Sequence, residues 1–148
     1  LVVVMPACGF ITATGAMVIG LLAGLSPYLF VVFVKAKLKY DDALDTFGVH
    51  AVGGTLGAVL TGLLATGKAN PNLLLADYAG RNGLARLVTD GGLVFAQLKA
   101  IGLTLALTLV GTMVLALVVK ATVGLRAAPE VESQGLDLAE HGESGYEQ

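Results

Sequence analysis

The sequence has few of the residues that build water-soluble enzymes. Only 14% of its 148 residues are charged, tryptophan is absent, and there are two histidines and one cysteine. This charge is too sparse to cover a soluble globule. The single Cys8 excludes an internal disulfide and a cysteine-based metal site, and its apolar neighbours favour a small packed residue.

Motifs of catalysis and of cofactor binding are also missing. The sequence contains no GxSxG, no HExxH, no phosphate-binding glycine loop and no CxxC pair. No basic patch is present that would neutralise nucleic-acid phosphates, and the net charge is -2. The sequence therefore gives no indication of an enzyme. It also predicts no metal site, no cofactor and no nucleic-acid partner.

What the chain has is apolar sequence: 55% hydrophobic residues, 20 glycines and a mean hydropathy of +0.81. Residues 1–34 carry no charge, and this run is too long for one membrane span of about 20 residues. Pro6 and Gly9 lie where the run can be divided, so helices are expected over about residues 1–8 and 14–34.

Within the second of these helices, small residues recur every four positions at Ala16, Gly20 and Gly24. This spacing lets helix backbones approach closely in lipid, so it predicts helix packing by Gly20 and Gly24 rather than ligand contact.

Three lysines at positions 35, 37 and 39 follow, and a short lysine-rich loop argues for the cytoplasmic side of a membrane. The next helix is expected over residues 42–65. Asp42 and Asp45 would lie in its first turn, where carboxylates complement the helix dipole. They could also lend negative potential to a cytoplasmic vestibule that favours a cation. The two roles are compatible, and both remain open.

His50 lies in a stretch without charged residues that runs from Phe47 to Ala65. An ionisable group inside a membrane span is costly and is therefore read as functional. Thr46, His50, Gly53 and Gly57 share one stripe at helical spacing, which suits a pore wall or close helix packing.

The rest of the chain is expected to form an outer loop, a last span and a polar tail. The loop covers residues 66–92, and a helix follows over 93–123, where Thr104, Thr108 and Thr112 share a face that favours packing. The tail, 124–148, is acidic and rich in glycine, and composition alone would predict disorder there.

Several stretches, in order, resemble the Amt/Mep/Rh ammonium transporter family: MPACGF, AMVIGLLAG, KAKLKYDDALD, ALDTFGVHAVGG and VGLRAAPEVESQGLDLAEHGESGY. The resemblance implies an all-α membrane protein, a bundle of transmembrane helices that is the C-terminal part of an eleven-helix subunit, with a cytoplasmic tail. It also implies a regulatory tail that folds against the inner face. The residues of this tail that match the family are Gly135, Asp137, His141, Gly142 and Glu143.

The resemblance further implies transport of ammonium or ammonia through a hydrophobic pore, with ammonium deprotonated before passage. Thr46 and His50 would belong to that pore, and His50 would pair with a histidine from an earlier helix. Ala51 departs from the family's usual glycine. A homotrimer in the cell membrane and a PII-type signalling partner at the cytoplasmic face are also implied.

Two other interpretations remain open. The parent protein could be chiefly an ammonium sensor that uses the same pore site and signals through its tail. The chain could also belong to a structural helical protein, or to a channel for protons or small neutral solutes.

Overall fold

The computed structural model describes residues 1–75, 81 and 83–143, and its regular structure over these residues is helical, without strands. Three of the described helices are long and apolar enough to cross a membrane: Ala13–Leu38, Phe47–Leu64 and Leu93–Thr122. The predicted all-α membrane class is therefore confirmed. The chain divides into two compact units, Leu1–Thr104 and Leu105–Gln148, which are described separately.

The first spanning helix consists of α1 (Ala13–Leu29), a π-helical segment (Phe30–Lys35) and α2 (Ala36–Leu38). The Thr12 hydroxyl caps its start by accepting a hydrogen bond from the Gly15 N–H at 3.3 Å. The helix continues beyond the expected end at residue 34, because lysine side chains at a helix end can extend their amines toward water. It ends at Lys39, whose φ of 53° is left-handed.

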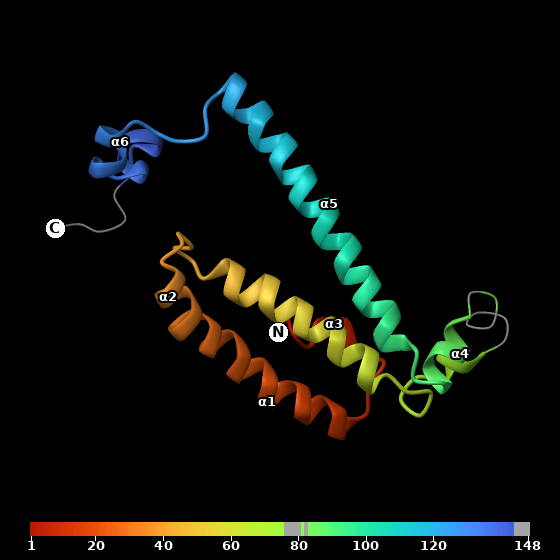
Figure 1. Ribbon diagram of the computed structural model, residues 1–148. Helices are drawn as coiled ribbons and strands as arrows, with labels where there is room; N and C mark the ends of the chain where they lie inside the picture. The colour runs from red at the N-terminus through yellow and green to blue at the C-terminus, as the bar shows by residue number, and fades with distance from the viewer. Residues whose placement is uncertain (76–80, 82, 144–148) are drawn as a thin grey trace. The chain divides into compact units, whose positions relative to one another are not determined.

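The second spanning helix consists of a π-helical segment (Phe47–Val52) and α3 (Gly53–Leu64), and it lies alongside α1 (Figure 1). The expectation that it begins at residue 42 was wrong. Asp45 has a φ of 55°, which is incompatible with a right-handed helix, so the helix starts only after this residue.

Residues 1–8 do not form the expected end of a long helix but a short 3₁₀ turn, Met5–Ala7, that contains Pro6. This N-terminal segment packs against α3. Val3 and Ala7 are buried there together with Ile19 and Leu60, and these four residues form the core of the first unit.

Two glycines allow this close packing. A Cβ atom at Gly57 would collide with the main-chain oxygen of Val3, and one at Gly53 would lie 3.1 Å from the Val3 Cγ2. Gly62, farther along α3, lies as closely against Val94, because a Cβ there would be 2.7 Å from the Val94 Cα.

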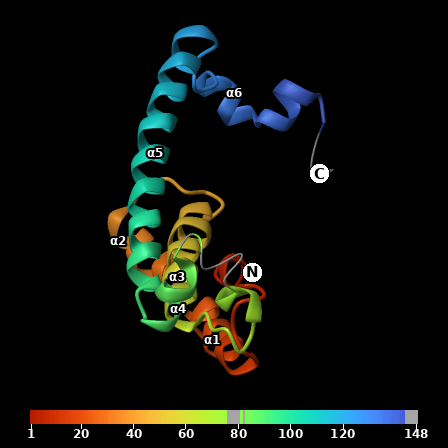
Figure 2. The same cartoon turned by 90° about the vertical axis from the view of Figure 1, so that its right-hand side faces the viewer.

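The connection after α3 contains a 3₁₀ turn (Pro71–Leu74) and α4 (Leu84–Thr89). Residues 76–80 and 82 of the predicted loop lie outside the described residues. Then α5 (Leu93–Thr122) runs as one continuous helix (Figure 2). Its 30 residues correspond to about 45 Å at 1.5 Å per residue, longer than a hydrocarbon core of about 30 Å.

The second unit contains α6 (Pro129–Gln134) and a π-helical turn, Asp137–His141. Arg126 lies between α5 and α6. It donates two hydrogen bonds to the carboxylate of Glu132 on α6, from Nε at 2.6 Å and from Nη2 at 3.2 Å. Thus the tail has local helical structure, where composition alone predicted disorder. Its residues 144–148 lie outside the described part of the chain.

Gly57→Ala is expected to destabilise the parent protein by about 1–3 kcal/mol, because the added methyl group overpacks against a main-chain oxygen. Gly54→Ala is the matched control, since its methyl group would be in ordinary contact, 3.7 Å from the Val2 Cγ1. The unfolding midpoints of the two purified variants in detergent, each compared with that of the wild type, measure the loss of stability. Equal unfolding midpoints for the two variants would contradict the packing described here.

The Arg126–Glu132 pair is expected to weaken in acid. The hydrogen bond from Arg126 lowers the pKa of Glu132 below its ordinary 4.5, with the guanidinium charge adding to this and partial burial opposing it. A carboxyl group with a lowered folded-state pKa stabilises the fold above its unfolded pKa, and this contribution is lost as pH falls through the folded value.

Hydrogen exchange of residues 126–134, corrected for the intrinsic rate at each pH, measures this loss. Protection is expected to decrease below pH 4.5 in the wild type but not in Glu132→Gln, which has no ionisable group at this position. Glu130→Gln is the control and should keep the wild-type profile. An unchanged profile in Glu132→Gln would exclude the pair as the cause.

Candidate functional site

The turn between the first two spanning helices, residues 39–46, holds the charged residues that most closely precede His50 in the sequence. The Lys35 ammonium lies 2.5 Å from the Asp45 Oδ1 and 2.5 Å from the main-chain oxygen of Asp42. The Asp45 N–H donates to the same Asp42 oxygen at 3.1 Å. One lysine at the end of the first helix therefore binds the Asp45 carboxylate and the Asp42 backbone together.

Asp42 caps the second spanning helix from outside it. Its carboxylate accepts hydrogen bonds from the Thr46 N–H at 2.8 Å and the Phe47 N–H at 3.0 Å. These amides belong to the start of the helix, where no earlier carbonyl is available as a partner. The structure thus places both aspartates before the helix and not within its first turn, with Asp42 at the cap and Asp45 in the ion pair.

Phe47 fixes the start of the helix by packing. Its ring lies 5.8 Å from that of Phe30 on the first helix and 5.8 Å from that of Tyr40 in the turn. The neighbouring Gly48 is buried, and a Cβ there would lie 2.7 Å from the Val31 Cγ2. Burial, with the Asp42 charge adding to it, raises the pKa of Tyr40 above 10.0, so this residue stays uncharged near neutral pH.

His50 lies in the π-helical segment and is exposed on this chain, as is Thr46. Gly53 and Gly57, expected on the same stripe, are buried against the N-terminal segment. A π-helical turn closes i→i+5 hydrogen bonds, so it changes the angular relation between the residues before and after it. The predicted stripe is therefore divided into an exposed part around His50 and a packed part at the glycines.

The predicted packing glycines behave differently from one another. Gly53 and Gly57 pack within the chain, whereas Gly20 and Gly24 are exposed, and a Cβ at either would meet nothing within 4 Å among the described residues beyond its own helical surroundings. Gly48 and Gly62 also make close contacts, which the sequence interpretation missed. Their signal was available, since both continue the run of glycines in the segment that holds Gly53 and Gly57.

The Lys35–Asp45 ion pair was also missed. Its signal is a lysine at the end of one apolar run, followed within ten residues by acidic residues that precede the next. The lysines were read only as markers of the cytoplasmic side.

The tail residues singled out in the sequence lie between the end of α6 and the end of the π-helical turn that follows it. Gly135 ends α6 with a φ of 97°, and Gly142 ends the next turn with a φ of 67°. The Glu143 N–H donates to the Asp137 main-chain oxygen at 3.2 Å across this turn, which includes His141. Within residues 1–75, 81 and 83–143, no three His, Cys, Asp or Glu residues are grouped to hold a metal ion.

Comparison with known proteins identifies the family. Residues 1–146 match the model of the Ammonium Transporter Family. An ammonium transporter of Bacillus subtilis strain 168 is 40% identical over 147 residues, which cover 99% of this chain and 34% of the relative. An ammonium transporter of Aquifex aeolicus is 41% identical over 146 residues, covering 99% of this chain and 32% of the relative.

Ammonium transporter Amt1 of Archaeoglobus fulgidus is 39% identical over 146 residues, covering 99% of this chain and 34% of the relative. The chain thus spans about a third of the length of the curated relatives it matches. Because the family match extends over nearly all of its residues, the chain belongs to the ammonium transporter family of multi-pass membrane proteins.

Proposed function

We propose that this chain forms the C-terminal part of an ammonium transporter and that His50 contacts the permeating species. The observation that carries this proposal is the place of His50: it is the one ionisable side chain between Asp45 and Lys68, within an apolar helix of a chain that belongs to the ammonium transporter family. Its side chain is exposed on this chain, so it is free to line a path that the rest of the subunit completes.

The physical problem of ammonium transport explains why a histidine suits this place. A small cation is costly to move through an apolar constriction, and loss of its proton removes most of that cost. An imidazole can donate a hydrogen bond from one ring nitrogen and accept at the other. In the proposed mechanism ammonium gives up a proton before the constriction, ammonia passes through it, and the proton moves separately along His50 and a partner histidine from an earlier helix.

Asp42 and Asp45 are better supported as helix-positioning residues than as a vestibule that attracts cations. Asp45 is paired with Lys35, and both carboxylate oxygens of Asp42 accept main-chain N–H groups. These contacts compensate the negative charge that a vestibule would present. Thr46, exposed one turn before His50, would lie at the cytoplasmic end of the proposed pore.

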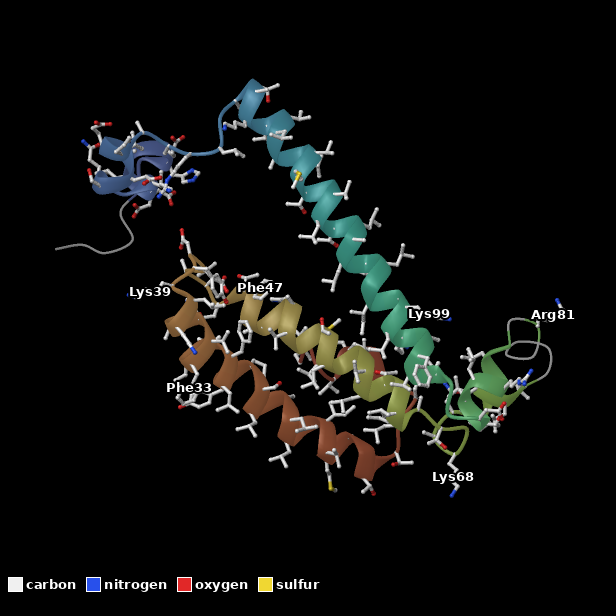
Figure 3. All side chains as sticks on the ribbon, viewed as in Figure 1. Phe33, Lys39, Phe47, Lys68, Arg81 and Lys99 are labelled. Carbon is white, nitrogen blue, oxygen red and sulfur yellow. The ribbon has the colours of Figure 1, made fainter. Side chains whose placement is uncertain are left out.

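The proposed orientation of the chain rests on its lysines. Lys39 lies at the end of the helix pair where Phe47 begins the second span, and Lys68 lies at the opposite end (Figure 3). Lys35, Lys37 and Lys39 lie at the end of the first spanning helix and at the start of the turn, so we place the turn, and with it the C-terminal tail, on the cytoplasmic side of the cell membrane. A homotrimer and a PII-type partner at that face are part of the same proposal.

His50→Ala in the full-length parent is expected to lower ammonium uptake by about 10²-fold or more, the range that loss of a positioned proton-transfer group produces. Proteoliposomes loaded with equal amounts of folded protein, with uptake and current recorded together, measure the effect. Val49→Ala, which shortens the exposed neighbouring side chain without removing an ionisable group, should stay near the wild-type rate.

Two outcomes would contradict the proposal. Unchanged uptake and current in His50→Ala would remove His50 from the conduction path. A well-folded wild type without uptake would overturn transport itself and would make ammonium sensing the leading function.

A further inference from the structure

The turn between the first two spanning helices contains backbone that needs support. Asp45 and Lys39 have φ values of 55° and 53°, a left-handed conformation that residues with a side chain adopt at an energetic cost. Such residues persist where their surroundings hold them in place. The turn must therefore contain contacts that offset this cost.

Lys35 supplies such contacts to Asp45 from outside the turn. Its ammonium binds the Asp45 side chain and the Asp42 main-chain oxygen, each at 2.5 Å, and the Asp45 N–H binds that same oxygen. The Lys35 and Asp45 side chains are 26% and 39% exposed, so solvent screens the pair only in part. The left-handed Asp45 is thus held through its side chain by Lys35 and through its backbone by Asp42.

The same turn sets where the helix that carries His50 begins. The Asp42 carboxylate binds the N–H groups of Thr46 and Phe47, and the Asp45 main-chain oxygen accepts the Val49 N–H at 2.9 Å. His50 follows Val49 directly. A shift of the helix start by one residue would rotate His50 about the helix axis by about 100°. A fixed turn therefore means a fixed direction of the imidazole.

We propose that Lys35 is a positioning residue for His50, acting through Asp45 and Asp42 on the start and rotation of the second spanning helix. The inference rests on the proposed role of His50 in conduction. Lys35 itself touches no permeating species: its action is to hold the turn from which the π-helical segment Phe47–Val52 begins.

A simpler role for Lys35 makes a different prediction. If it served only as a cytoplasmic positive charge, Lys37 would be equivalent, because it lies two residues farther along the same helix end and is exposed. If the pair were an ordinary exposed ion pair, its loss would have little effect. Variants at both lysines therefore separate positioning from the effect of charge alone.

The test uses the full-length parent in proteoliposomes, with ammonium as substrate. Lys35→Met removes the ammonium, Asp45→Asn removes the carboxylate while keeping a residue that tolerates a left-handed backbone, and the double variant combines them. Lys37→Met is the matched control, and Lys35→Arg restores the positive charge. All rates are compared at equal amounts of folded protein.

The maximal rate of Lys35→Met is expected to fall about tenfold, within the roughly hundredfold loss that a 1 Å displacement of a reacting group can cause. Its KM should stay near the wild-type value, since a positioning residue that does not contact ammonium changes the rate of passage and not the binding of ammonium. Asp45→Asn should match this loss, the double variant should be no worse than the poorer single variant, and Lys35→Arg should recover most of the rate. Lys37→Met should behave as wild type.

Hydrogen exchange supplies a second measurement that does not depend on transport. Amides of residues 46–52 should exchange faster in Lys35→Met and Asp45→Asn than in the wild type, and not in Lys37→Met. Unchanged exchange there would overturn the positioning role even where the transport rate of Lys35→Met falls. Additive rate losses, or an equal loss in Lys37→Met, would also overturn it. A wild type without uptake would instead refute the proposed function, whatever the exchange shows.

Discussion

The contact between the N-terminal segment and the glycine face of α3 is the one on which the first unit depends. A cluster of buried side chains gathers around it: Val3 and Ala7 of the N-terminal segment, Leu60 of α3 and Ile19 of α1. Inside a bilayer the hydrophobic effect contributes little to the association of helices, because lipid tails are as apolar as the side chains. Association there depends on close van der Waals packing. Glycines at positions 53 and 57 make this packing possible because a larger residue would separate the backbones.

Away from this contact, little of the surface of the apolar helices is buried within the chain. The most apolar stretch of α5 has no buried residue. In the first spanning helix, only a small part of the most apolar stretch is buried. Surfaces of this kind require lipid or further helices around them, and the chain spans only about a third of its relatives' length. The exposed Gly20 and Gly24 fit the same explanation, since small residues spaced by four serve close helix contacts.

The sequence was sufficient to predict the features that depend on composition over long stretches. Apolar runs gave three spanning helices and the all-α class, and the family was recognisable from motifs around His50 and in the tail. It did not predict where the second spanning helix begins. That start depends on a left-handed Asp45 and a lysine ten residues earlier, and helical periodicity carries no information about either.

The π-helical segments were equally invisible to the sequence. Periodicity assumes a constant number of residues per turn, so a stripe drawn from Thr46 to Gly57 ignored the change of register within Phe47–Val52. The site residues themselves were predicted from their chemistry and from the family motif. Neither basis depends on the local geometry of the helix. Their surroundings depend on tertiary contacts such as that between Phe47 and Phe30, and these could be seen only in the folded chain.

Two of the close glycine contacts of the second spanning helix differ in the substitutions that they allow. Gly57 faces a main-chain oxygen of Val3, which every residue type carries, so no replacement at position 3 makes room for a side chain at position 57. Gly48 faces the side chains of Val31 and Phe30, which smaller residues can replace. Positions 48 and 31 are therefore able to covary among relatives, whereas a side chain at position 57 cannot be accommodated by any replacement at position 3.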